Sequence, residues 1–244
     1  MNAGRGGSAA AILARGLGVP ALAGAAAILG FAPFYAWPVA IASLAALFLV
    51  WMRSGSPLQA ALSGYAFGLG LNLAGVSWVF VSLHEFGSMP APLAAAATFL
   101  FCAFLAIFPA GAGWAARRMA PGGRLGDAVT MAACFALVEW VRGWILTGFP
   151  WLTMGYSQAP ASPLAGFAPV FGAYGVSLAT GLAAACLAAA FASIAWSRER
   201  WTAVGGLALL FAAGALLRLV SWTDPAGPAV SVSLLQGNVS QHLK

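Results

Sequence analysis

Four long stretches without Asp, Glu, Lys or Arg are the strongest constraint on how this chain can fold. They cover residues 16–52, 54–84, 86–116 and 143–197. A helix crosses the hydrocarbon core of a bilayer with roughly 20 apolar residues, so each stretch allows one pass and the longest allow two. Only 7% of the residues are charged, against roughly a quarter in a soluble domain, which leaves too few charges to cover a water-facing surface. The sequence therefore predicts an all-α integral membrane protein.

About seven transmembrane helices are predicted by the apolar stretches and by the breaks between them. The breaks coincide with clusters of Gly, Pro and Ser, or with Arg198-Glu199-Arg200, all of which are typical of turns and loops. The expected spans are 9–29, 35–52, 58–83, 90–116, 125–146, 164–196 and 201–220. Many of these segments are rich in Gly and Ala, which lets helix backbones approach closely inside a membrane.

The distribution of basic residues predicts the orientation, because loops on the cytoplasmic side retain an excess of Lys and Arg. With the N-terminus inside, eight basic residues lie on the inner side, and only Arg142, Arg218 and Lys244 lie on the outer side. An odd number of spans then places the C-terminus outside. The eight inner residues are Arg5, Arg15, Arg53, Arg117, Arg118, Arg124, Arg198 and Arg200.

The last twenty residues follow a different pattern. After two Pro-containing turns, residues 230–234 alternate between Val or Leu and Ser, which is typical of a β-strand. We therefore divide the chain into a polytopic transmembrane domain over 1–222 and, over 223–244, a linker with the first strand of a soluble domain on the outer face.

Several functional classes are disfavoured by the same residues. The net charge of +6 arises from arginines at the ends of apolar runs, which indicates topology and not nucleic-acid binding. Cys102, Cys134 and Cys186 lie in apolar segments without metal-ligand spacing, so we expect them to pack between helices, and we expect no metal or cofactor. Intramembrane proteolysis is disfavoured, because Ser157 has no histidine near it in the sequence to act as a base.

Polar and aromatic residues near the outer ends of the spans are the candidate site. Glu139 and Arg142 are three residues apart and would meet on one helix face, either as an internal ion pair or as part of a site for a lipid headgroup. His84 and Glu85 end the third span, as an interfacial polar end or as a second part of such a site. Trp151 and Tyr156 lie in an uncharged connection over 147–163 that is typical of an interfacial hairpin or a re-entrant segment.

Six sequence blocks, taken together and in order, resemble apolipoprotein N-acyltransferase over essentially the whole chain. They are Gly30-Phe31-Ala32-Pro33-Phe34 with Trp37-Pro38; Gly75 to His84 with Phe86-Gly87; Glu139 to Trp144 running on to Thr147-Gly148-Phe149-Pro150-Trp151; Gly155-Tyr156-Ser157-Gln158; Phe171 to Ser177; and Leu235-Gln236-Gly237-Asn238.

The resemblance implies an enzyme of the bacterial inner membrane that transfers an acyl chain from a phospholipid to the amino group of a lipoprotein's diacylglyceryl-cysteine. In the family, the acyl chain passes through a thioester on a cysteine in a periplasmic nitrilase-like domain, which also supplies a glutamate and a lysine. That domain would begin near Val230, so no catalytic residue of the family can be assigned to this chain. We expect a monomeric membrane part that anchors the catalytic domain, guides the two lipid substrates and is inactive alone. The alternative is a stand-alone membrane module that binds or transports lipid.

Overall fold

The computed structural model describes residues 6–193 and 197–237, with side chains from Leu17 onward. Within these residues all regular secondary structure is helical, as the composition predicts. The elements are α1 (Gly6–Ala27), η1 (Ile28–Gly30), α2 (Trp37–Arg53), α3 (Pro57–Gly75), α4 (Trp78–Val81), η2 (Ser82–Phe86), α5 (Ala91–Leu105), α6 (Ile107–Met119), α7 (Arg124–Arg142), η3 (Ile145–Thr147), η4 (Met154–Gln158), η5 (Pro163–Phe167), α8 (Ala168–Ala192) and α9 (Arg198–Leu217).

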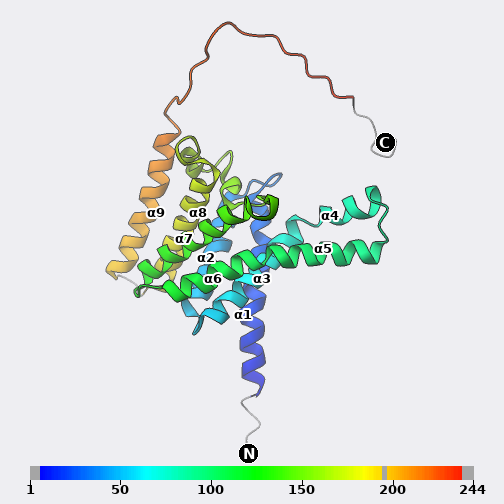
Figure 1. The fold of residues 1–244 in the computed structure, drawn as a ribbon. Helices are drawn as coiled ribbons and strands as arrows, with labels where there is room; N and C mark the ends of the chain where they lie inside the picture. The colour runs from blue at the N-terminus through cyan, green and yellow to red at the C-terminus, as the bar shows by residue number, and fades with distance from the viewer. Residues whose placement is uncertain (1–5, 194–196, 238–244) are drawn as a thin grey trace, which may run out of the picture.

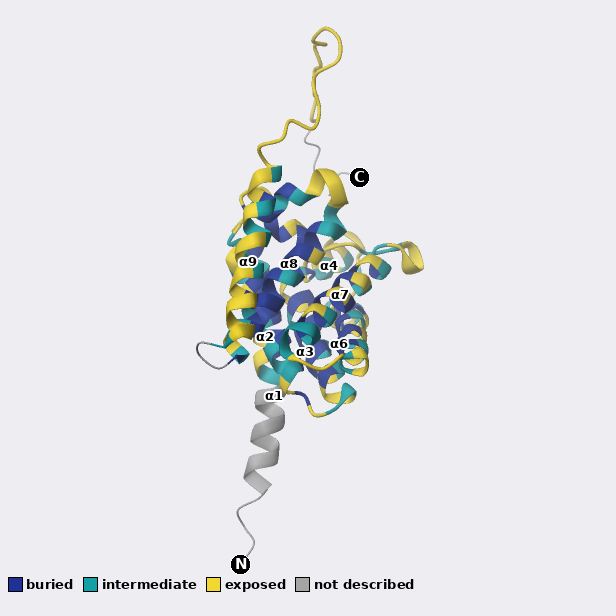
Figure 2. Cartoon of the chain, turned by 90° about the vertical axis from the view of Figure 1, so that its left-hand side faces the viewer, coloured by how far each residue is buried: buried dark blue, intermediate teal, exposed yellow. Residues whose placement is uncertain are grey.

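The core lies where α2, α7 and α8 meet α3 and α6. Phe48, Trp51 and Phe67 are fully buried there, and Phe135 of α7 packs edge-on against both Phe48 and Phe67. Figure 2 shows the contrast between the buried α8 and the exposed outer surface of α9. Because α9 exposes large apolar side chains such as Leu209 and Leu216, its outer surface suits contact with lipid.

Glycines bring α1, α3 and α6 into backbone contact. A Cβ atom added at Gly24 of α1 would collide with the carbonyl oxygen of Phe67, and one at Gly70 of α3 would collide with that of Ala21. A Cβ at Gly64 would likewise collide with the carbonyl oxygen of Pro109 in α6. Small residues at these contacts confirm the close helix packing expected from the Gly-rich and Ala-rich segments.

Two of the predicted spans are interrupted helices. The third bends by 50° between Pro57–Gly75 and Trp78–Phe86, and the fourth breaks at Ala106 between α5 and α6. Pro109 explains the second break, because proline lacks an amide hydrogen and its ring clashes with the carbonyl group four residues earlier. Figure 1 shows α4 and α5 side by side in an arm that extends away from the other helices; α4, η2 and α5 are called the arm below.

Each of the seven predicted spans overlaps a helix, but fewer meet the requirements for crossing a membrane. Among the described residues, Ala91–Met119, Pro163–Ala192 and Arg198–Leu217 are long and apolar enough, and the bent pair makes a fourth if it counts as one span. Leu17–Gly30 and Trp37–Arg53 are apolar but shorter. The structure thus supports three to four spans by length and composition, and seven remains a prediction.

Two predictions differ from the structure: the end of one span and the strand near the C-terminus. The predicted span 125–146 is wrong at its end, because α7 ends at Arg142 and the backbone turns at Leu146 and Thr147, whose φ angles are positive. The strand expected at 230–234 is not confirmed, since residues 229–237 have no helix or strand and are exposed. A lone strand has no partner for its backbone hydrogen bonds, which explains its absence from the described tail.

The three cysteines confirm the packing role predicted for them. Cys102 of α5, Cys134 of α7 and Cys186 of α8 are all buried and free. Cys186 packs close to Gly206 of α9, where an added Cβ atom would approach its sulfur to 3.3 Å. Their small side chains therefore fill interhelical contacts.

Candidate lipid-binding site

The connection after α7 folds back into the helix bundle. Its η4 turn packs on α8 and α2 and buries Met154, Ser157 and Gln158. The Ser157 hydroxyl donates to the Met154 carbonyl oxygen at 2.6 Å and accepts from the Gln158 side-chain amide at 2.8 Å. The structure thus shows a turn buried against the bundle, and the interfacial hairpin and the re-entrant segment both stay predictions.

Glu139 of α7 binds the first residue of the η4 turn. Its carboxylate Oε1 accepts a hydrogen bond from the Met154 amide at 2.9 Å, while the next amide, of Gly155, donates to the Ser177 hydroxyl of α8 at 2.8 Å. Glu139 is only 4% exposed, and the hydroxyl of Ser177 lies beside its carboxylate. A buried carboxylate that accepts a backbone hydrogen bond acts as a strong support for the segment it holds.

The ion pair considered for Glu139 and Arg142 does not form. Both side chains are buried, but among the described residues the structure records an ion pair only between Arg124 and Glu199. Arg142 instead donates from Nη2 to the Thr153 hydroxyl over 3.5 Å, and its backbone carbonyl accepts from the Phe149 amide at 2.9 Å. The two charged residues therefore hold the same turn at separate points.

A large apolar cavity of about 820 Å³ lies beside this turn and is called the large cavity. Such a volume falls within the range of roughly 300–1,000 Å³ that is usual for small-molecule sites. No charged side chain lines it. Its walls are Ile28, Phe31, Ala32, Tyr35, Gly75, Trp78, Pro150, Trp151, Leu152, Tyr156, Ala159 and Pro160.

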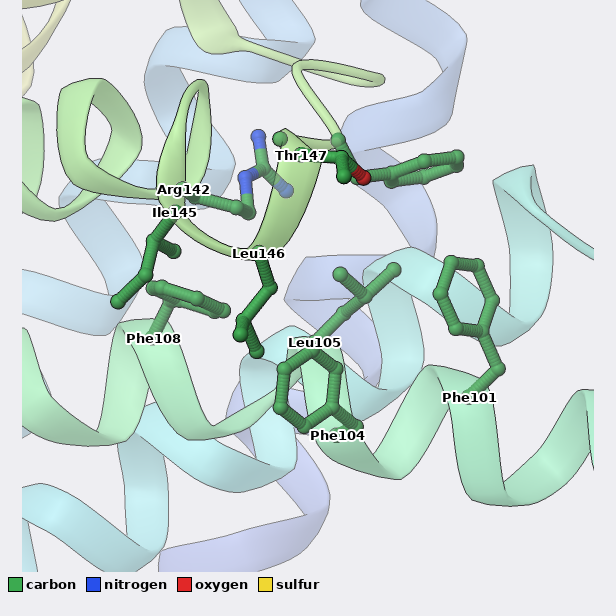
Figure 3. A pocket seen from close by; sticks show the side chains of 10 residues that line it. Phe101, Phe104, Leu105, Phe108, Arg142, Ile145, Leu146 and Thr147 are labelled. Carbon is green, nitrogen blue, oxygen red and sulfur yellow. The ribbon is translucent and has the colours of Figure 1, made fainter.

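A smaller cavity of about 280 Å³ lies between the α5–α6 break and the turn that follows α7, and is called the arginine cavity. Figure 3 shows Phe101, Phe104, Leu105 and Phe108 extending from α5 and α6 while Arg142, Ile145, Leu146 and Thr147 come from the other side. Gly148 and Phe149 complete its lining. Arg142 is its one charged residue.

Strained backbone is concentrated at the two cavities. Five non-glycine residues in the described chain have positive φ angles, and all except Ser88 line a cavity. Leu146 and Thr147 line the arginine cavity, and Tyr35 and Leu152 line the large cavity. Such conformations cost of order 1–3 kcal/mol each and tend to cluster at functional sites. Their positions favour these two cavities as the candidate functional site.

The structure brings together four of the six candidate residues predicted from the sequence. Trp151 and Tyr156 line the large cavity, Arg142 lines the arginine cavity, and Glu139 supports the turn between them. His84 and Glu85 lie apart from them in η2 of the arm, where both are exposed. There His84 Nδ1 is 2.8 Å from the Met89 carbonyl oxygen. These two residues line neither cavity.

Sequence reasoning missed the aromatic row that joins the two cavities. The ring centroids of Phe101 and Phe149 are 5.0 Å apart, those of Phe149 and Trp151 are 6.4 Å apart, and those of Trp151 and Trp78 are 5.4 Å apart. Phe149 and Trp151 were visible as an aromatic pair in an uncharged loop, but Phe101 lies in a continuous apolar helix where nothing in the sequence distinguishes it.

Comparison with known proteins identifies the family. The family model described as "Apolipoprotein N-acyltransferase N-terminal domain" matches residues 23–186. A protein of Nitrosomonas europaea named apolipoprotein N-acyltransferase is 50% identical over 226 residues, which cover 91% of this chain and 44% of that protein. Proteins of the same name from Ralstonia nicotianae and Methylococcus capsulatus are 43% and 45% identical, over 92% and 88% of this chain and 42% of each relative.

The chain thus spans less than half the length of these relatives. The matched residues include both cavities and the turn between them. The chain belongs to the apolipoprotein N-acyltransferase family and corresponds to its N-terminal domain.

Proposed function

We propose that this chain is the membrane part of an apolipoprotein N-acyltransferase, which anchors a catalytic domain and guides its lipid substrates. The reaction moves an acyl chain from a phospholipid to the N-terminal diacylglyceryl-cysteine of a lipoprotein. The observation that carries the proposal is the large cavity: an uncharged space of about 820 Å³ in a chain of this family.

The walls of the large cavity suit hydrocarbon with a polar end. Phe31, Ile28 and Leu152 offer apolar surface, while Trp78, Trp151 and Tyr156 are each about half exposed at its edge. Aromatic rings with a polar tip favour the level of lipid headgroups, where one end of the ring is apolar and the other is hydrated. An acyl chain in the cavity would thus have its headgroup end among these rings.

The chemistry of transfer is proposed for a nitrilase-like domain outside this chain. A thiolate there attacks the ester of the phospholipid, forms a thioester and releases the lysophospholipid, and the amine of the acceptor then displaces the thiolate. The cysteines of the present chain are buried between helices, so they are poor candidates for that thiolate. The role proposed for the membrane part is to bring the donor and then the acceptor to the thiolate of that domain.

The proposed setting is the bacterial inner membrane, with about seven spans, a cytoplasmic N-terminus, a periplasmic C-terminus and a monomeric chain. The basic residues support this orientation, because Arg117 and Arg118 lie in the last turn of α6 and Arg124 begins α7, on either side of the same connection. Figure 1 supports it as well: α1 begins at one end of the molecule, and the segment after α9 leaves from the opposite end.

The proposal is tested with the protein expressed from its complete coding sequence. Purified in nanodiscs, it should transfer a labelled acyl chain from phosphatidylethanolamine to a peptide that carries diacylglyceryl-cysteine. Trp78→Ala should lower transfer at least tenfold, about 1.4 kcal/mol. The matched control is Trp114→Ala, because Trp114 of α6 is similarly exposed but lines neither cavity. Lipid binding without any transfer would instead favour the stand-alone lipid-binding or transport module.

A further inference from the structure

Arg142 is a buried cation with few hydrogen-bond partners among the described residues. Its side chain is 5% exposed, and its hydrogen bond to Thr153 is long, at 3.5 Å. Its Nε atom has no hydrogen-bond partner among the described residues, and Glu139 influences it only through space. Removing a cation from water costs several kcal/mol unless hydrogen bonds or a counter-charge compensate. Glu139 supplies a counter-charge through space, but the guanidinium keeps hydrogen-bond capacity that the described residues do not use and that an anion can fill.

The arginine cavity is the space from which such an anion would reach Arg142. No carboxylate lines it, so the one charged wall residue that an anion meets is Arg142, while the Glu139 carboxylate acts on Arg142 through space from outside the lining. Thr147 and Gly148, from the turn that follows Arg142, also line it. A planar guanidinium can donate two parallel hydrogen bonds to a phosphate, a geometry that a lysine cannot offer.

The remaining walls select a ligand that also carries hydrocarbon. Phe101, Phe104 and Phe108 present three aromatic side chains from α5 and α6, and Leu146 and Ile145 face them from the turn after α7. Phe104 and Leu146 are 41% and 76% exposed, so the cavity opens at the apolar surface of the protein. Its volume of about 280 Å³ is below the usual range for a whole small-molecule ligand, and so suits one part of a larger molecule.

We propose that the arginine cavity binds the phosphodiester of a glycerophospholipid, with the guanidinium of Arg142 as the phosphate ligand and the phenylalanines against the adjoining hydrocarbon. The assignment deepens the proposed function and rests on it in one respect, that the bound phospholipid is the acyl donor. The acceptor lacks this phosphate. The arginine cavity therefore distinguishes donor from acceptor, a distinction that the uncharged large cavity does not make.

Photolabelling tests the assignment directly on this chain, reconstituted in nanodiscs. The probe is phosphatidylethanolamine with a diazirine on the first carbons of one acyl chain, and the comparison probe is diacylglycerol with the same diazirine but no phosphate. The expected result is labelling of peptides that contain residues 101–108 and 143–149 by the phospholipid, at least fivefold above the diacylglycerol. Equal labelling by the two probes would overturn the proposal.

Variants separate the charge from the shape of the cavity. Arg142→Gln should lower phospholipid labelling at least fivefold, Arg142→Lys should restore only part of it, and Arg118→Gln, at an exposed arginine of α6, should leave it unchanged. Ile145→Trp keeps the charge but fills the cavity, and it should also lower labelling if the lipid occupies this space. This second variant decides the question if Arg142→Gln fails to fold. Unchanged labelling in Ile145→Trp would contradict the proposal.

A competition experiment identifies the source of the phosphate. Inorganic phosphate at 10 mM should leave phospholipid labelling unchanged, because the apolar walls contribute to lipid binding alone. Displacement of the lipid by the free ion would assign the cavity to inorganic phosphate and overturn the lipid assignment.

Failure of this proposal is distinguishable from failure of the proposed function. If the protein from the complete coding sequence transfers acyl chains and Arg142→Gln retains both labelling and the wild-type KM for phosphatidylethanolamine, the phosphate site is wrong and the function stands. If labelling depends on Arg142 but no acyl chain is transferred, the phosphate site stands and the function is wrong.

Discussion

The Glu139 carboxylate holds the backbone amide of Met154, fifteen residues further along the chain, at a distance of 2.9 Å. This bond fixes the re-entering turn against the end of α7, and both partners are buried. Glu139→Ala should destabilise the protein by about 1–3 kcal/mol, because it leaves the Met154 amide buried without its acceptor.

Glu139→Gln is the matched control, since its side-chain oxygen still accepts from the Met154 amide while the negative charge is lost. Thermal unfolding in a mild detergent should place the glutamine variant below wild type, because Arg142 loses the nearby negative charge, and the alanine variant lower still, because it also loses the hydrogen bond to Met154. Equal melting temperatures for the two variants would show that the hydrogen bond contributes little to stability.

The backbone contact between α1 and α3 gives a second prediction. Gly70→Ala places a methyl group against the carbonyl oxygen of Ala21, and overpacking of this kind typically costs about 1–3 kcal/mol. Gly111→Ala in α6 meets nothing within 4 Å and should be neutral or stabilising by up to about 1 kcal/mol, because alanine favours the helix. Resistance to unfolding in increasing SDS measures both. A Gly70→Ala protein as resistant as wild type would rule out this close contact.

The orientation of the spans can be read with fused reporters. A reporter after Gly123, between α6 and α7, should be cytoplasmic, because Arg117, Arg118 and Arg124 flank that point. Reporters after Gly87, at the end of the arm, and after Gly227 should be periplasmic. Alkaline phosphatase, active only outside, and green fluorescent protein, fluorescent only inside, give complementary signals. A cytoplasmic signal at Gly227 would refute the odd number of spans.

The thiols provide a test of the packing around α5, α7 and α8. Cys102, Cys134 and Cys186 are buried, so a maleimide should label none of them in the folded chain and all of them after denaturation in SDS. Incubation with labelled phospholipid should leave no label that neutral hydroxylamine releases, because none of these sulfurs is accessible for thioester formation. Release of label would assign acyl-transfer chemistry to the membrane part itself.

Much of the fold could be predicted because one physical requirement dominates the sequence. Apolar runs such as 16–52 can cross a membrane only as helices, and Gly, Pro and Arg mark where those helices end, so every expected span overlaps a helix. The end of α7 could not be predicted, because the residues that follow Arg142 are still apolar and the close approach of Gly143 to Tyr174 is a long-range contact. The break at Ala106 had a visible cause in Pro109, and the bend after Gly75 had none.

The candidate site could be predicted only in its charged and aromatic members. Glu139 and Arg142 stand out against an uncharged background, and the helical period predicts that they share one face of α7, which the structure shows to be buried. An ion pair between them was one of the two alternatives, but each is instead bound to the turn over 149–154, which returns from a distance that local spacing does not encode. Ser177 and Phe101 contribute through the same long-range folding, which local sequence does not encode.

The contacts of Gly24, Gly64 and Gly70 have a mechanical consequence. Helices that are separated by side chains can shift as those side chains change rotamer, but helices in backbone contact cannot slide or rotate without collision. We therefore expect α1, α3 and α6 to move as one rigid unit. A movement that admits a lipid into either cavity would then arise in the arm or in the turn after α7, where the close backbone contacts of these three helices do not extend.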